Sequence, residues 1–559
     1  MLTLFKMKVN SRLHQLLESK FLIKAVITLF FFLQIKNIFN GGTTYDTMDL
    51  RFGSHNVLDK LIMMYELDFN NSIFSNFTST EYFGLILIFP IYIGAHIINR
   101  FTYDYVDTIF ISNDSYIYFN MHLLLIIYVS LSLYFIASFL KVKYNTTKVN
   151  IFIIFLLLVP SFTGHSLFNL KDIPYLIQLF LINLFLINNY GENIQTQYSK
   201  KRIFTAAFLI ALSVSIRINA YLFILFTFGL IFLKHITTKN VNKIFIIEGG
   251  ISLFSSILIL FLLSPQGWVR PLQLLRETFD HQFNHGWPGS TLTNGEFVIA
   301  QEVSSSYLFD WFLSRMPLFI FVGLIAFISL VITKKLKLTL YSQYSLIFVL
   351  FVFSSFPIIR PTAYDGLRHF LFVIPYLLIL FTESFEHFLN RKTYFSMFYV
   401  LVIVFYSVFT QYGLGPYKYL YFNETVNLSD AAYYCDESID GCGNWPTDYW
   451  GYKGKEVAEY INTNFEEKFS QDKLMVCKPK HTVEPYLDKE IKLTTIDDLK
   501  AGDTVFIVTY QRPRYMEDSC YFNNYKITRV CEEEFSFQQN IRQSEINLAY
   551  ITKCFIERT

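Results

Sequence analysis

Long apolar runs separated by short polar turns make up most of the chain. A helix needs roughly 17 to 25 apolar residues to cross about 30 Å of hydrocarbon. One apolar run, 82–98, is long enough to cross but contains Gly84, Pro90 and Gly94. We interpret this run as an interfacial or half-inserted helix. The other runs predict about eleven membrane-spanning helices, at 21–39, 116–140, 150–163, 173–188, 203–216, 218–233, 244–264, 317–333, 340–358, 366–383 and 393–412.

The composition agrees with a polytopic membrane protein of mainly α class. Of the 559 residues, 53% are hydrophobic and only 16% are charged, whereas about 25% of the residues of a soluble domain are charged. The net charge of +2 comes from scattered basic residues, so nucleic acid is not expected as a partner.

Clusters of lysine and arginine predict the orientation, because they accumulate in short cytoplasmic loops. If 82–98 does not cross, all of them fall on one side: the amino-terminal tail and 141–148, 200–202, 234–243, 334–337 and 391–392. The first apolar run has no small-residue cleavage site after it, so we expect an uncleaved anchor. The membrane domain is then 1–412, with external loops at 40–115, 164–172, 265–316 and 359–369.

The remainder, 413–559, is predicted to be a small extracytoplasmic α/β domain. Residues 454–465 have helical spacing, and 473–478, 503–510 and 547–555 read as strands. All six cysteines lie here, so we expect at least one disulfide, with Cys435 and Cys442 the most plausible pair, although spacing alone leaves other pairings open. No catalytic constellation is evident, which favours a binding or structural appendage.

Acidic and basic side chains collect at the external ends of the apolar runs. Asp46 and Asp49 follow the first span, where a partly desolvated carboxylate can act as a general base, although a solvated loop is the simpler interpretation. In "GHSLFNLKDIPY", with His165 and Lys171, Asp172 either caps the next helix or has a functional role.

Three further groups are candidates for binding. Arg217 lies between two apolar runs, where it must pair or snorkel to the interface. His281 and His285, four residues apart, could bind a metal or a phosphate, with Glu81 as a third ligand if the fold brings it there. The stretch "RPTAYDGLRHFLFVIP" has two arginines, which suit a phosphate diester; its candidates are Tyr364, Arg368 and His369.

Three ordered motifs, "HSLFNLKDIPY", "YDGLRHFLFVIPY" and "GPYKYLYFNETV", resemble bacterial membrane glycosyltransferases of the GT-C superfamily. The resemblance covers about residues 20 to 455 and is to the family 39-like group, which includes the dolichyl-phosphate-mannose protein mannosyltransferases and the aminoarabinose transferases. It implies transfer of a sugar from a polyprenyl phosphate to a protein, glycan or lipid acceptor on the non-cytoplasmic face, usually with inversion. The location implied is the bacterial inner membrane, with the site facing the periplasm.

The resemblance also implies roles for individual residues. Asp46 matches the catalytic aspartate of the first external loop, and Asp172 matches a second acidic position. Arg368 falls where the family places a basic residue near the lipid phosphate, and His281 lies near a loop that in some relatives helps to hold a divalent cation. Many relatives have a second acidic residue directly after the first, whereas Thr47 follows Asp46 here, so Asp49 could share the role of base.

Two other classes of protein remain open on the sequence. A secondary transporter would also bury charges, but it should show internal repeats and polar groups at mid-membrane depth. A non-catalytic scaffold that binds polyprenyl lipid could have the same fold without using the base.

Overall fold

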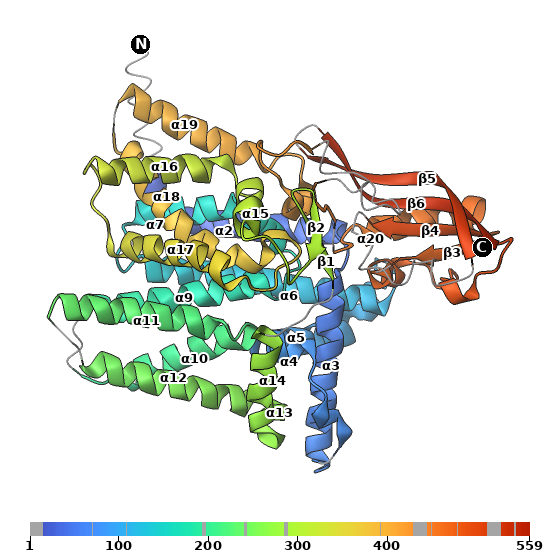
Figure 1. Ribbon diagram of the computed structural model, residues 1–559, viewed down its shortest axis with the longest axis horizontal. Coiled ribbons are helices and arrows are strands. Elements are labelled where there is room, and N and C mark those ends of the chain that lie inside the picture. The colour runs from blue at the N-terminus through green and yellow to red at the C-terminus, as the bar shows by residue number, and fades with distance from the viewer. Residues whose placement is uncertain are drawn as a thin grey trace.

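The computed structural model describes residues 15–558 except 70, 108, 193–196, 240–242, 284–288, 392, 429–443, 449, 478, 511–526 and 542–543. A bundle of long helices carries a small sheet at one end (Figure 1). The helices along the bundle are α2 (Lys20–Asn40), α6 (Asn113–Leu140), α7 (Thr146–Leu157), α9 (Asp172–Tyr190), α10 (Lys200–Ile216), α11 (Ala220–Thr237), α12 (Lys243–Leu263), α16 (Leu318–Ile332), α17 (Leu340–Ile359), α18 (Ile374–Leu389) and α19 (Tyr394–Phe409). Each corresponds to one predicted apolar run.

Length and composition make this an integral, multi-pass membrane protein. Among the described residues, eight helices are long and apolar enough to cross a membrane, or nine if α15 (Tyr307–Arg315) and α16, which meet at 108°, form one broken span. The outer helices turn large apolar side chains outward, as Phe254, Leu258 and Leu262 do on α12. Such a surface is stable against lipid and not against water.

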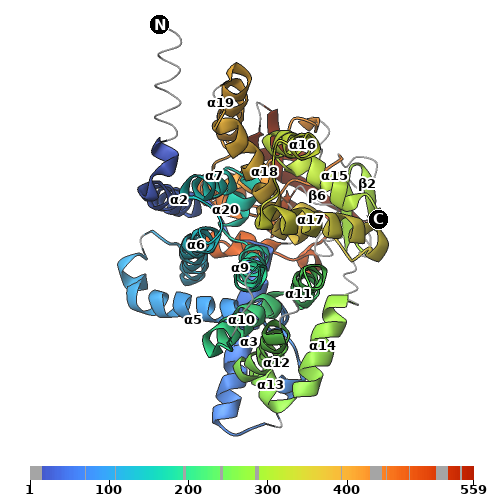
Figure 2. The ribbon, with the colours of Figure 1, turned by 90° about the vertical axis from the view of Figure 1, so that its left-hand side faces the viewer.

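The helix α5 (Leu85–Thr102) is oriented differently from the bundle. It lies within Leu85–Tyr105, which is one of the eight described helices that could cross a membrane by length and composition. Figure 2 shows α5 from the side, however, whereas α6, α9 and α11 are seen end-on. The helix α3 (Tyr45–Tyr65) also runs across the bundle (Figure 1). The orientation of α5 therefore agrees with the interfacial interpretation of 82–98.

Two stretches form the buried centre of the bundle. Asp172–Tyr190 and Gly366–Leu389 are each long enough to cross a membrane, and in each 94% of the most apolar 18 residues are buried inside the protein. The second stretch begins as a 3-10 helix, η3 (Gly366–Val373), which packs against α9 before α18 continues it. The start of α9 and η3 lie at the end of the bundle nearest the sheet, which we call the site end (Figure 1). Described turns rich in lysine, 141–145 between α6 and α7 and 333–339 between α16 and α17, join the helices at the opposite end (Figure 1).

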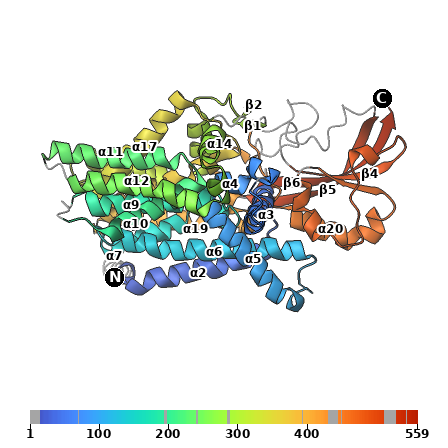
Figure 3. The same cartoon turned by 90° about the horizontal axis from the view of Figure 1, so that it is seen from below.

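The carboxyl-terminal region confirms the predicted mixture of helix and strands. The helix α20 (Gly454–Asn464) packs on a four-stranded sheet of order β3-β4-β6-β5, which stands beyond the site end (Figure 3). Its strands are β3 (Lys473–Val476), β4 (Thr504–Tyr510), β5 (Ile527–Ile541) and β6 (Ser544–Arg558). Within this described sheet, β3 and β4 pair in parallel and the other neighbouring strands pair antiparallel.

The disulfide prediction is confirmed in its general form. Cys531 on β5 and Cys554 on β6 are direct cross-strand partners and form a disulfide. Cys477 is also disulfide-bonded. The pairing expected for Cys435 and Cys442 lies outside the described residues. The apolar core around α9 extends into this region through Trp450 and Tyr452, and the boundary at 412/413 stays a prediction.

Candidate functional site at the external end of the bundle

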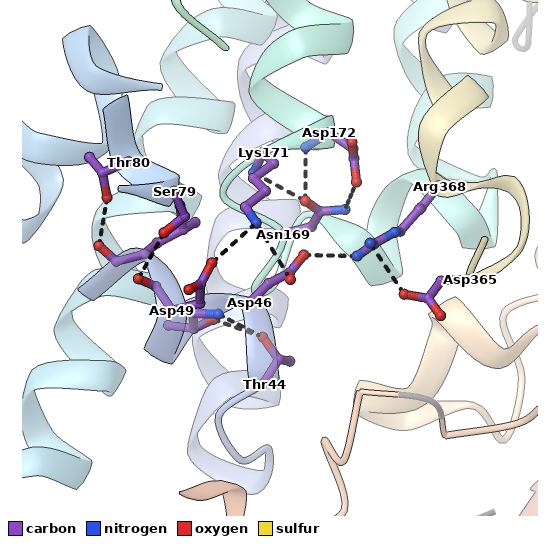
Figure 4. A network of polar contacts seen from close by, with 12 residues as sticks. Thr44, Asp46, Asp49, Ser79, Thr80, Asn169, Lys171, Asp172, Asp365 and Arg368 are labelled. Carbon is purple, nitrogen blue, oxygen red and sulfur yellow. Dashed lines mark hydrogen bonds and ion pairs between the residues drawn. The ribbon is translucent and has the colours of Figure 1, made fainter. Parts of the chain in front are cut away.

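The charged residues predicted from four separate external segments meet at the site end. Figure 4 shows Asp46 between Lys171 and Arg368, with Asp172 and Asp365 beside them. Asp46 lies in the first turn of α3, whose start is capped by Thr44: the Thr44 hydroxyl accepts a hydrogen bond from the backbone amide of Thr47 at 3.3 Å. The first turn of α3 lies beside Lys171, the residue before α9, and beside Arg368 in η3.

Asp46 makes the central ion pairs. Its carboxylate accepts a hydrogen bond from Arg368 Nη1 at 2.8 Å and lies 3.5 Å from Lys171 Nζ. Lys171 also lies 3.8 Å from Asp49, and Arg368 lies 3.2 Å from Asp365. The Asp46 side chain is 16% exposed and that of Asp49 is 41% exposed, so Asp46 is the carboxylate held inside the site and Asp49 stands at its rim.

These neighbours determine the protonation state of Asp46. Burial disfavours the charged form and alone would raise the pKa of Asp46, but the charges of Lys171 and Arg368 outweigh burial and lower it below the ordinary aspartate value. The carboxylate is therefore ionised at neutral pH, as a general base must be before it accepts a proton.

Asp172 is ion-paired rather than acting as a helix cap. It occupies the first turn of α9, and its carboxylate pairs with Arg217 and accepts a hydrogen bond from Asn169 Nδ2 at 3.0 Å. The Asn169 side-chain oxygen in turn accepts hydrogen bonds from the backbone amides of Lys171 and Asp172. Arg217, at the carboxyl end of α10, is held by this pair instead of reaching to the interface.

Arg217 and Arg368 each have a buried side-chain donor without a hydrogen-bond partner among the described residues. Within the described part of the chain, neither Arg217 Nε nor Arg368 Nε has a hydrogen-bond partner, although both atoms are buried. The ring of Phe83, at the end of α4 (Ser79–Phe83), lies 4.7 Å from Lys171 Nζ and 5.8 Å from the Arg217 guanidinium. The site thus combines buried cationic donors with an aromatic wall.

The other predicted binding residues surround this centre. The Tyr364 ring centroid lies 4.8 Å from the Arg368 guanidinium and 4.7 Å from the ring of His369. His165, the last residue of α8 (Pro160–His165), is 4% exposed, and its Nδ1 is 3.1 Å from Asn169 Nδ2. Burial lowers the pKa of His165 to about 3, so its ring is neutral and supports Asn169.

Of the three residues proposed for a metal site, Glu81 is the one whose side chain the structure describes. Glu81 forms a buried ion pair with Lys60, at 2.8 and 2.9 Å to its two oxygens. His281 lies on α14 (Pro271–Phe283), but its side chain, like His285, lies outside the described residues. Among the residues that are described, no three His, Cys, Asp or Glu side chains form a group that could hold a metal. The divalent cation stays a prediction.

Two aromatic residues of the site were not predicted from the sequence. Phe83 contacts two of the cations, and the ring centroid of Trp450 lies 5.0 Å from the Arg368 guanidinium. Trp450 belongs to the region expected to be an appendage, so that region also contributes to the site. The only local signal is the glycine after Trp450, because Gly451 has a φ of +67° that marks a tight turn.

Comparison with known proteins finds similarity at the level of structure. No family model matches the sequence, and no curated protein matches it. Among solved structures, the chain is similar to ArnT from Cupriavidus metallidurans bound to undecaprenyl phosphate, at 10% sequence identity and a TM-score of 0.47. The match covers 95% of this chain and 97% of that chain.

Proposed function

We propose that this protein is a membrane glycosyltransferase that moves a sugar from a polyprenyl phosphate to an acceptor, with Asp46 as the general base. The observation that carries the proposal is the Asp46 carboxylate, held between Arg368 and Lys171 at one end of an apolar helix bundle. We place this end on the non-cytoplasmic face of a bacterial inner membrane, because the basic turns lie at the opposite end.

The cations suit the phosphate of the donor. Guanidinium groups match phosphate oxygens and remain charged at all relevant pH values. The unused Nε donors of Arg217 and Arg368 are available to such oxygens without breaking an existing hydrogen bond. The prenyl chain would lie along the apolar outer faces of the bundle, next to lipid.

A single displacement accounts for the remaining chemistry. The acceptor oxygen or nitrogen attacks the anomeric carbon, its proton passes to Asp46, and the bond to the polyprenyl phosphate breaks with its electron pair on the phosphate oxygen. The configuration is inverted in such a step. When the donor phosphate binds Lys171 and Arg368, these cations stabilise the phosphate as well as the Asp46 carboxylate. The carboxylate is then less strongly stabilised, so Asp46 is a stronger base once the substrate is bound.

Cations for the departing phosphate come from the protein itself, and electrostatic stabilisation of this kind supplies a large part of many enzymatic rates. Asp172 contributes by holding Arg217 in position through their buried ion pair.

The test is a comparison of donor binding with sugar transfer. Asp46→Asn should keep a co-purified polyprenyl phosphate, detected by native mass spectrometry in mild detergent, and lose transfer. Arg368→Ala should lose the lipid itself. The matched control is Asp59→Asn on the same helix, because Asp59 is 41% exposed and should leave both properties unchanged.

The same comparison separates the alternatives. If Asp46→Asn transfers sugar at the wild-type rate, Asp46 is not the base, and Asp49→Asn then tests the carboxylate at the rim. A wild type that binds polyprenyl phosphate without any transfer would favour the scaffold. A wild type that binds no such lipid would remove the basis of the proposal and favour the transporter.

A further inference from the structure

A tight turn from the carboxyl-terminal region, residues 450–453, reaches into the site, and we call it the Trp450 turn. It is organised by Asp448, which is fully buried. The Asp448 carboxylate accepts hydrogen bonds from the Tyr419 hydroxyl at 2.5 Å and from the backbone amides of Tyr452 and Lys453 at 3.0 and 2.8 Å. Three donors on one buried carboxylate hold the turn in a single conformation.

The Trp450 turn is attached to the segment that carries Asp46. The Tyr45 amide donates to the Trp450 carbonyl, and the Gly42 amide donates to the Tyr452 carbonyl, both at 3.3 Å. A Cβ atom at Gly42 would stand 2.8 Å from that Tyr452 oxygen, so only glycine allows this approach. The start of α3 and the turn are therefore positioned together.

The Trp450 ring is fixed against Arg368. Its side chain is 2% exposed, and its ring packs edge-to-face with His165 and Phe168, with centroids 5.2 and 5.1 Å apart. The Arg368 guanidinium lies 5.0 Å from the centroid of the Trp450 ring and 4.8 Å from that of Tyr364. An aromatic face attracts a guanidinium without occupying its N–H groups. Those groups bind Asp46 and Asp365, and within the described part of the chain Nε has no hydrogen-bond partner.

We propose that Trp450 is a positioning residue, which holds the Arg368 guanidinium so that its free donor meets the phosphate of the lipid donor. The Trp450 turn then makes the carboxyl-terminal region part of the transferase site. This inference rests on the proposed function, and it assigns to the recognition of phosphate a residue from outside the three motifs that carry the resemblance.

The first experiment measures binding of undecaprenyl phosphate to the purified full-length protein by native mass spectrometry titration. Trp450→Leu should weaken binding roughly 2- to 30-fold, the range expected for loss of one cation–π contact. Trp450→Phe should recover most of the affinity, since it retains an aromatic face. The control is Trp445→Leu, because Trp445 is also buried but packs on Trp311 and Phe422, and its affinity should equal that of the wild type.

Thermal unfolding of the same variants separates positioning from general packing. Trp450→Leu and Trp445→Leu both remove a buried ring and should lower the unfolding temperature, whereas only the first should weaken binding. Equal affinities for Trp450→Leu and the wild type would overturn the inference. If Trp450→Leu does not fold, Trp450→Met, which also lacks an aromatic face, is titrated in the wild-type and Arg368→Lys backgrounds, and a smaller effect in the second background is expected.

The outcome for the wild type distinguishes the two proposals. If the wild type binds no undecaprenyl phosphate, the proposed function fails. The inference is then judged on the thermal stability of Trp450→Met, Arg368→Gln and the double variant, because each single change removes the cation–π contact. Non-additive effects would show that the two side chains act together, and strictly additive effects would overturn the inference.

Discussion

The buried ion pair between Asp172 and Arg217 allows a quantitative prediction. The Asp172 side chain is 2% exposed and that of Arg217 is 10% exposed. Asp172→Asn keeps the shape of the side chain but leaves the arginine charge buried without its counter-ion. Breaking such a pair costs about 3 to 5 kcal/mol of folding free energy. Coulomb's law gives a similar figure, about 4 kcal/mol for unit charges about 4 Å apart at an effective dielectric constant of about 20.

A double-mutant cycle in detergent would measure this coupling. We expect Asp172→Asn and Arg217→Met each to lower the free energy of unfolding by about 3 kcal/mol, because each leaves one buried charge unpaired. The double variant should lose much less than the sum, since it has no unpaired charge. Equilibrium unfolding with urea, followed by tryptophan fluorescence, gives the four values.

An exposed pair provides the control. Lys143 and Glu192 are 2.6 Å apart at the opposite end of the bundle, with side chains 24% and 49% exposed. Glu192→Gln should cost less than about 1 kcal/mol, as surface pairs do. Should Asp172→Asn prove as mild as Glu192→Gln, or should the two single effects simply add, the claim that this pair is a buried, coupled unit would be refuted.

Three further predictions concern other parts of the chain. The pKa of Asp46 is lowered, so kcat/KM should fall only as the pH drops through that low pKa. In Lys171→Gln one charge that stabilises the carboxylate is lost, so this fall in kcat/KM should begin at a higher pH. A pH–rate profile identical to that of the wild type would contradict this prediction. The side chains of Lys60 and Glu81 are both fully buried, so Glu81→Gln should destabilise the fold by about 3 kcal/mol. The double variant with Lys60→Met should recover this stability, whereas a divalent metal added to Glu81→Gln should not restore it. Replacing Cys531 with Ser should cost about 2 to 5 kcal/mol and expose the terminal sheet to proteolysis, whereas unchanged protease resistance would show that the disulfide is dispensable.

The positions of the helices were predictable because lipid leaves few alternatives. A span must satisfy its own backbone groups and present an apolar surface, and both requirements are visible in the sequence. The details at helix breaks were not predicted. The run 150–163 is divided, because α7 ends at Leu157 and Pro160 begins the separate helix α8. The run from 366 begins as the 3-10 helix η3 and becomes α18 just before Pro375.

The charged residues of the site were predictable, but their pairings were not. A charge at the end of an apolar run is costly unless it is paired, so Asp172, Arg217 and Arg368 stand out in the sequence. Which residue pairs with which depends on how α9, α10 and η3 cross, and spacing along the chain carries no information on that.

Trp450 could not be identified from the sequence, for a different reason. In a chain in which 19% of the residues are aromatic, one tryptophan carries no signal, and this one lies 82 positions from Arg368, as the two residue numbers show. A charged residue in an apolar run indicates a partner, because burying an unpaired charge is costly. An aromatic ring that contacts a charge can be buried without such a cost, so it gives no comparable signal. Sequence analysis therefore finds the charged groups that would bind and react, and the structure is needed to find the uncharged residues that hold them in place.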